Sequence, residues 1–153
     1  MKLSIRSARI VPSPTLSITA KAKAMMAQGI GVIDFSAGEL AQDTPDSAKK
    51  AGEIAIQTGF TRYTPVPGTD ELRQAIADKL QRDQEVTYDK SQILVSCGAK
   101  HSLYNLFQAL IDPGDEVIIP APYWVSYPDQ VLLADGTPVI LETQESKNYA
   151  IDP

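Results

Sequence analysis

The sequence predicts an α/β fold with a parallel-strand βαβαβ core and a helical arm at its N-terminus. Three short runs rich in β-branched residues, 93–95, 116–119 and 139–141, alternate with stretches whose apolar residues recur every three or four positions. This alternation favours a parallel sheet with right-handed crossovers. A sharp glycine turn, 96–100, joins the first run to its helix. The segment from Gln92 to Pro128 is therefore the centre of the predicted fold.

The N-terminal part predicts an arm, one helix and a short strand. Residues 1–11 are short, basic and unpatterned, as is typical of an arm. Ser13-Pro14 supplies a cap and a proline that fits the first helical position, and Gly29 supplies a stop. The apolar run 32–35 predicts a strand that leads into a turn at Gly38.

Two further helices are predicted before the central segment. The first begins at Thr44-Pro45-Asp46, where a hydroxyl cap, a proline and an acid follow one another, and it ends near Gly59. The second begins at Thr69-Asp70-Glu71. The final helix is expected over 127–134, between the last two strands.

Composition narrows the classes of function. The chain has 153 residues, of which 43% are hydrophobic and 22% charged, as is typical of a globular domain. The net charge is −5 and no Lys/Arg cluster is present, which argues against nucleic acid or an anionic membrane as a partner. The single Cys97 permits no internal disulfide and fits a reducing compartment such as the cytoplasm.

The glycine turn predicts an anion site. Backbone N–H groups at Gly98, Ala99 and Lys100 open a helix, and helix N-termini favour phosphate. Trp124 follows the neighbouring strand and can supply a flat wall beside that site. The alternatives are an ordinary turn between strand and helix and a tryptophan that only packs.

Seven short motifs add a family resemblance. In chain order they are Ser13-Pro-Thr, Ala37-Gly-Glu, Arg62-Tyr-Thr-Pro, Gly98-Ala-Lys-His, Tyr104-Asn-Leu-Phe-Gln, Asp112-Pro-Gly-Asp-Glu-Val and Pro122-Tyr-Trp-Val-Ser-Tyr-Pro. Together they resemble the fold-type I, class I aminotransferases that use pyridoxal phosphate, in particular the bacterial-type aspartate aminotransferases. The similarity covers essentially the whole chain.

The resemblance implies an overall organisation. The chain would be the N-terminal part of the aspartate aminotransferase-like fold, with 1–45 forming the arm and part of the small domain and 46–153 the first part of the large cofactor-binding domain. The implied reaction moves an amino group between an amino acid, here aspartate, and a 2-oxo acid, here 2-oxoglutarate. Tyr63 matches a tyrosine that reaches the cofactor phosphate of the other subunit, which implies a homodimer.

The resemblance also assigns roles to residues of the central segment. Gly98, Ala99 and Lys100 match the phosphate-binding turn of the family. Trp124 matches the aromatic residue that stacks on the pyridine ring beside the substrate. Gly38 matches the position whose backbone meets the substrate carboxylate.

The residues that carry the family's chemistry lie beyond the matched region. They are a Schiff-base lysine, an aspartate on the pyridine nitrogen and an arginine that clamps the substrate carboxylate. We therefore predict no catalytic residue within this chain, since Lys49 is expected on a helix surface and Lys100 in the phosphate turn. No metal site is predicted. The loop 40–45 departs from the family pattern, which leaves substrate preference open.

Three alternatives remain beside the aminotransferase. One is a pyridoxal-phosphate-dependent carbon–sulfur lyase of the same fold, whose N-terminal motifs overlap. Another is a truncated remnant without catalysis. A nicotinamide-binding domain is disfavoured because the turn at Gly98 lacks the Gly-x-Gly-x-x-Gly pattern.

Overall fold

The computed structural model describes residues 3–10, 12–36, 38 and 40–151. Contacts between Cα atoms divide the chain into two compact units. The first unit comprises residues 1–38 together with 98–153, and the second comprises residues 39–97. No helix in the described part of the chain combines the length and the apolar character needed to cross a membrane.

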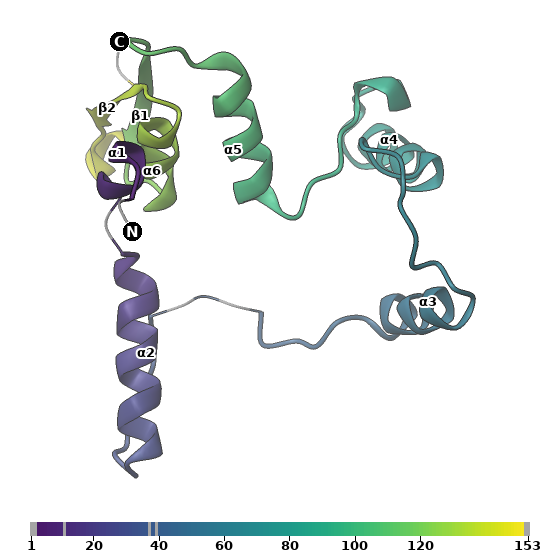
Figure 1. The fold of residues 1–153 in the computed structure, drawn as a ribbon, viewed down its shortest axis with the longest axis horizontal. Coiled ribbons are helices and arrows are strands. Elements are labelled where there is room, and N and C mark those ends of the chain that lie inside the picture. Colours follow the sequence, from purple (N-terminus) through teal and green to yellow (C-terminus); the bar gives the residue numbers. More distant parts are fainter. Residues whose placement is uncertain (1–2, 11, 37, 39, 152–153) are drawn as a thin grey trace. The chain divides into compact units, whose positions relative to one another are not determined.

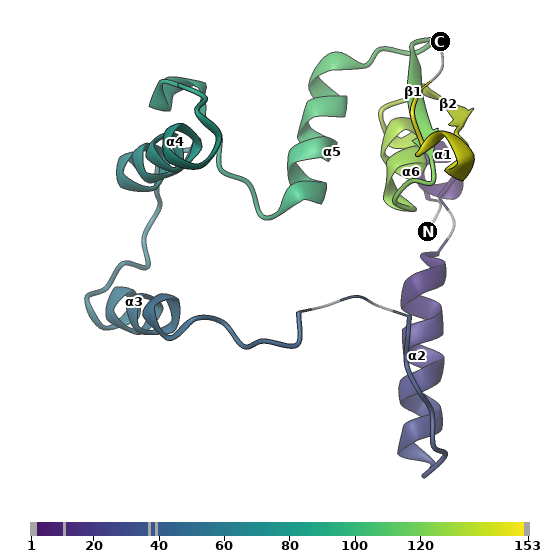
Figure 2. The ribbon, with the colours of Figure 1, turned by 180° about the vertical axis from the view of Figure 1, so that it is seen from behind.

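The core of the first unit is a β–α–β unit (Figures 1 and 2). Strands β1 (Glu116–Ala121) and β2 (Thr137–Glu142) pair in parallel, and helix α6 (Ser126–Leu133) connects them and packs against both. Parallel neighbours need such a crossover, because the chain must return to the same end of the sheet. Val131 on α6 is completely buried, and Ile119 on β1 is only 5% exposed.

The turn between α6 and β2 is held closely by its neighbours. The N–H of Gly136 donates to the carbonyl of Val131 at 3.0 Å. A Cβ atom at Gly136 would lie 2.7 Å from Cγ2 of Ile111 and 3.1 Å from Cγ1 of Val131. Only a glycine therefore fits at this position without displacing its neighbours.

Two helices of the N-terminal part also belong to the first unit. Helix α1 (Ile5–Ala8) lies next to α6, and Arg9 forms an ion pair with Asp135 at 3.1 Å (Figures 1 and 2). Helix α2 (Pro14–Ala27) begins with proline after its cap, as predicted. The strand expected over 32–35 is wrong, because the structure assigns these residues no strand and the segment runs extended beside α2.

The second unit contains helices α3 (Asp46–Gln57) and α4 (Asp70–Gln84) and the short 3₁₀ helix η1 (Lys90–Gln92). The guanidinium of Arg73 on α4 donates from Nε to the carbonyls of Lys90, at 2.9 Å, and Ile93, at 3.1 Å. Lys90 in turn forms an ion pair with Asp70 at 2.8 Å. Polar contacts thus join α4 to the segment that follows it.

The α/β class is confirmed, but the first of the three expected parallel strands is not. Residues 93–95 are not a strand, because their backbone groups bond elsewhere. The N–H of Val95 donates to the carbonyl of Pro67 at 3.0 Å, and Arg73 binds the carbonyl of Ile93. The sheet in the described part of the chain therefore has two strands, β1 and β2.

Two further helices belong to the first unit. Helix α5 (Ala99–Leu110) precedes β1, and the 3₁₀ helix η2 (Glu145–Lys147) comes after β2.

Candidate functional site

Three of the predicted site residues line one pocket of the first unit. Gly38, Lys100 and Trp124 surround a cavity of about 260 Å³. The start of α2 and the start of α6 complete the wall. The residues that they contribute are Ser13, Pro14, Thr15, Leu16, Val125, Ser126 and Asp129.

Gly98 turns the chain into α5. Of the predicted turn residues Lys100 lines the pocket, whereas Gly98 and Ala99 do not. The backbone of Gly98 has φ 89° and ψ 167°, a conformation that residues with a side chain rarely adopt. No atom lies within 4 Å of the position that a Cβ would take, so the backbone conformation and not crowding requires glycine here. The sequence prediction of a sharp glycine turn is confirmed.

The first turn of α5 presents backbone donors at its exposed end. The first hydrogen bond of this turn runs from the N–H of His101 to the carbonyl of Gly98 at 3.1 Å. The N–H groups of Ala99 and Lys100 precede it, and no side chain caps the helix because Gly98 has none. The positive end of a twelve-residue helix dipole therefore coincides with exposed amides, an arrangement that favours an anion.

Lys100 and Trp124 contact one another across the pocket. The ammonium Nζ of Lys100 lies 5.3 Å from the centroid of the Trp124 ring, within the range of a cation–π interaction. The indole is 50% exposed, so this contact contributes about 0.5–1 kcal/mol. The ammonium covers one face of the indole, and a planar ligand stacking on that face would take its place.

The pocket therefore offers a specific set of groups to a ligand. Lys100 supplies a positive charge beside the amide end of α5, and Trp124 supplies a flat apolar surface. Asp129, from the first turn of α6, supplies one carboxylate on the pocket wall. This combination suits a planar ring that carries a phosphate or carboxylate.

Tyr63 belongs to the second unit. Its side chain is fully exposed and lines, with Thr61 and Arg62, a shallow hollow of about 560 Å³. The position of Tyr63 in an exposed loop agrees with the sequence prediction of a loop between two helices. Its role towards a cofactor stays a prediction.

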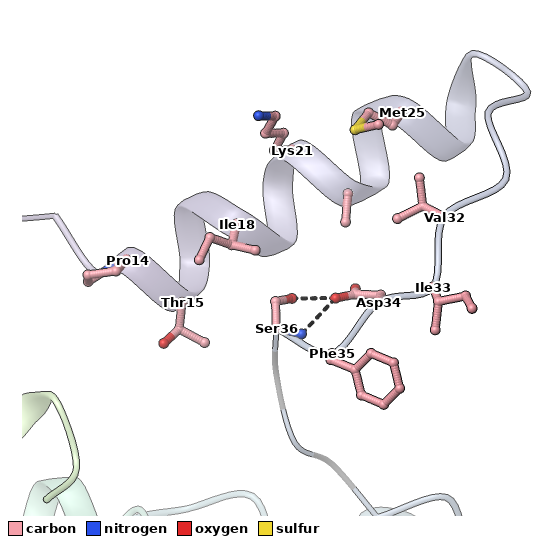
Figure 3. Close-up of a pocket in the computed structure, with 11 residues that line it drawn as sticks. Pro14, Thr15, Ile18, Lys21, Met25, Val32, Ile33, Asp34, Phe35 and Ser36 are labelled. Carbon is pink, nitrogen blue, oxygen red and sulfur yellow. Dashed lines mark hydrogen bonds between the residues drawn. The ribbon is translucent and has the colours of Figure 1, made fainter. Parts of the chain in front are cut away.

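A third hollow, of about 460 Å³, lies between α2 and residues 32–36 (Figure 3). Most of its lining is apolar, with Ile18 and Met25 from α2 and Val32 from the returning segment. The carboxylate of Asp34 already has local hydrogen-bond partners. It accepts from the hydroxyl of Ser36 at 2.5 Å and from the N–H of Ser36 at 2.9 Å. These bonds, the hydroxyl first, hold the pKa of Asp34 below its usual value. This hollow lacks the donor set of the pocket at α5.

The described residues contain no candidate metal site. Among them, no three His, Cys, Asp or Glu side chains lie close enough together to hold a metal ion.

Comparison with known proteins identifies the family. The family model for aminotransferases of class I and II matches residues 30–153. The chain belongs to this family. The predicted resemblance to class I aminotransferases is therefore confirmed.

Individual aminotransferases are similar over the whole chain. The aspartate/prephenate aminotransferase of Nitrosomonas europaea is 52% identical over 100% of this chain, and the aspartate aminotransferase of Bacillus subtilis is 50% identical over 100%. The chain covers only 38% and 39% of these two relatives. The solved aspartate aminotransferase of Thermus thermophilus with maleate superimposes with a TM-score of 0.95 at 41% identity, over 99% of this chain and 40% of that one.

Several residues in and near the pocket receive no individual role from the sequence. Ser13 and Thr15, which line the pocket, belong to one of the family motifs, and that motif is the signal for them. Gln130 was missed, although its amide donates from Nε2 to the carbonyl of Lys100 at 2.8 Å. The available signal is its position: Gln130 is a polar residue in an apolar stretch, next to the buried Val131 and four residues before the buried Ala134.

Proposed function

We propose that the protein is a pyridoxal-phosphate-dependent aminotransferase that moves an amino group from aspartate to 2-oxoglutarate. The observation that carries this proposal is the pocket shared by Gly38, Lys100 and Trp124, in a chain that belongs to the aminotransferase family. Relatives named aspartate aminotransferase support the choice of aspartate.

The residues present fit the phosphate and the ring of this cofactor. Exposed amides at a helix end with no side-chain cap are suitable donors for a phosphate, and the Lys100 ammonium adds a positive charge nearby. The half-exposed indole of Trp124 is a suitable surface for an aromatic ring. When bound, the cofactor supplies an aldehyde that takes up the amino group and a pyridine ring that accepts electrons.

Each proposed site residue would then have a distinct task. The N–H groups of Gly98, Ala99 and Lys100 would hold the phosphate at the start of α5. Trp124 would cover one face of the ring, exclude water from it and border the space for the substrate. The backbone of Gly38 meets the substrate carboxylate.

The remaining assignments concern the whole protein. We propose that it is a cytoplasmic homodimer in which Tyr63 reaches the phosphate bound to the partner subunit. Residues 1–45 then belong to the arm and the small domain, and 46–153 begin the large domain. The chain spans 38% of the Nitrosomonas relative, and the Schiff-base lysine, the aspartate and the arginine of the family are expected outside the matched region.

The decisive experiment is an assay of the full-length protein for amino transfer from aspartate to 2-oxoglutarate. We expect production of oxaloacetate and glutamate that depends on added pyridoxal phosphate. Pyruvate and ammonia released without a 2-oxo acid would instead indicate the carbon–sulfur lyase. The absence of both activities, in a folded protein that binds no cofactor, would contradict the proposal.

A second measurement concerns residues 1–153 alone. Because no lysine of this stretch is assigned to the cofactor aldehyde, adding pyridoxal phosphate should produce no stoichiometric imine absorption band. A stoichiometric band would show that one of these lysines, and not a later one, carries the cofactor.

A further inference from the structure

Gln130 connects α6 to the first turn of α5. Its side chain is 7% exposed, and its Nε2 donates to the backbone carbonyl of Lys100 at 2.8 Å. The orientation of the amide follows from this contact, because a carbonyl accepts only from the NH₂ side. The other side, Oε1, is buried and has no hydrogen-bond partner among the residues that the structure describes.

The hydrogen bond from Gln130 to Lys100 lies at the start of α5 and can therefore influence the pocket. Lys100 is the second residue of α5, so its carbonyl belongs to the turn whose amides face the proposed phosphate. A bond to that carbonyl fixes how far the first turn is rotated about the helix axis. The same residue places its ammonium over Trp124, so rotation of the turn would also move this contact.

We propose that Gln130 is a positioning residue for the anion-binding turn. It holds the backbone of Lys100 so that the first turn of α5 keeps its orientation and the Lys100 side chain lies in the pocket beside Trp124. This role rests on the proposed function, since it concerns the binding of the cofactor phosphate. Gln130 acts through the backbone of Lys100 and is not among the residues that line the pocket.

The presence of a glutamine at this buried position supports the role. Val131, the next residue of α6, and Ala134, which follows the end of this helix, are apolar and buried. A buried amide with an unsatisfied oxygen costs stability compared with an apolar side chain of similar size. Packing alone would favour the apolar residue, whereas the bond to Lys100 requires an amide.

A second glutamine that joins the same two helices serves as a control, although it is exposed whereas Gln130 is buried. Gln108 on α5 donates from Nε2 to the carbonyl of Leu133 on α6 at 3.2 Å. Both glutamines therefore join the same two helices through a side-chain amide and a backbone carbonyl. Gln108 lies in the C-terminal part of α5 and does not line the pocket, so its removal leaves the anion-binding turn in place.

The test compares Gln130→Met and Gln108→Met in the full-length protein. The measured quantities are the dissociation constants for pyridoxal phosphate and for pyridoxal, which lacks the phosphate, and the ³¹P resonance of the bound cofactor. For Gln130→Met we expect about tenfold weaker binding of pyridoxal phosphate, a change of pyridoxal affinity below about twofold, and a shifted ³¹P resonance. For Gln108→Met all three should match the wild type.

A second variant covers the case in which Gln130→Met does not fold. Gln130→Glu keeps the shape of the side chain but replaces the donor by an acceptor that faces the Lys100 carbonyl. It should show the same selective loss of pyridoxal phosphate affinity, measured against Gln108→Glu.

The outcomes separate the two proposals. Equal loss of affinity for both ligands with an unchanged ³¹P resonance would reduce Gln130 to a packing residue and overturn the positioning role. Unchanged affinity for both ligands would overturn it as well. A wild-type protein that binds neither ligand would overturn the proposed function, and the role of Gln130 would fall with it.

Discussion

The β1–α6–β2 core and the second unit are stabilised in different ways. In the core, Val131 and Ile119 are buried between a helix and two paired strands. Among the described residues of the second unit, only Ala77 is buried. Helix α3 has no buried residue. Directed polar contacts are prominent there, above all those of Arg73 with the carbonyls of Lys90 and Ile93.

This difference indicates which substitutions each region tolerates. Burial of apolar surface is not directional, so the core should respond to changes of volume. Hydrogen bonds and tight turns depend on angles, so residues 39–97 should respond to changes of backbone conformation and charge. The pocket lies at the edge of the better packed region, where α5 and α6 meet.

The largest effect is expected for Gly68→Ala in the second unit. Gly68 has φ 105°, and a Cβ there would lie 2.7 Å from Cγ2 and 3.0 Å from Cβ of Val95. Backbone strain and steric overlap act together, so the free energy of unfolding should fall by about 3–5 kcal/mol. Denaturant unfolding measures this loss, and hydrogen exchange should locate it in residues 39–97.

The matched control is Gly52→Ala in α3. Nothing lies within 4 Å of its Cβ position and its φ is not positive, so alanine should stabilise the helix by about 0.5–1 kcal/mol. Equal effects of the two substitutions would contradict the strain assigned to Gly68.

A smaller loss is expected for Gly136→Ala in the core. The overlap has the same closest approach, 2.7 Å to Cγ2 of Ile111, but Gly136 does not have a positive φ. The free energy of unfolding should therefore fall by about 1–3 kcal/mol, the cost of overpacking alone. The double variant Gly136→Ala/Ile111→Ala, compared with Ile111→Ala alone, tests the cause. It removes the Cγ2 atom that the new Cβ would overlap, so alanine at position 136 should then cost less. A loss as large as that of Gly68→Ala would show that strain is not the difference between the two glycines.

The effect of Trp124→Ala should appear in binding more than in stability. The indole is half exposed, and stacking on an aromatic ring contributes about 0.5–1.5 kcal/mol. Pyridoxal phosphate should therefore bind about 2- to 12-fold more weakly, as measured by equilibrium dialysis of the full-length protein. Trp124→Phe keeps an aromatic face and should lose less. An unchanged affinity in both variants would remove Trp124 from the cofactor site.

The smallest effect is a pH dependence of the second unit. The hydrogen bond and the charge of Lys90 lower the pKa of Asp70 below its usual value of 3.8. The unfolded carboxyl then binds a proton more readily, so this contribution to stability is present above pH 3.8 and is lost as the pH falls through the folded pKa. In Asp70→Asn, the decline of the unfolding free energy between pH 5 and pH 2, about the titration range of a carboxyl group, should be shallower. An identical decline would show that the pair does not contribute.

Local signals explain which elements could be predicted from the sequence. The starts of α2 and α4 depend on a side-chain cap and a first turn, and the turn at Gly98 depends on one residue. The hydroxyl cap predicted at Thr44 is wrong, because α3 begins after Pro45 without a side-chain cap bond. The family motifs identified Gly38, Lys100 and Trp124, which the structure brings together. All of these features are encoded in neighbouring residues.

Features that depend on distant partners could not be predicted in this way. The run 93–95 has the composition of a strand, but a strand also needs a neighbour, and Arg73 and Pro67 bind its backbone instead. The hydrogen bond from Gln130 to Lys100 likewise joins residues that are 30 positions apart in the sequence. Composition gives no information on such pairs.

The continuity of β1, α6 and β2 along the chain has a consequence for synthesis. Because the paired strands are separated only by their own connecting helix, closing this loop costs little chain entropy. The β–α–β unit can therefore assemble as soon as residues 116–142 have left the ribosome, without waiting for later segments. Helix α5 precedes this unit in the chain, so the residues that contact α5 from α6 would be in place while translation is still in progress.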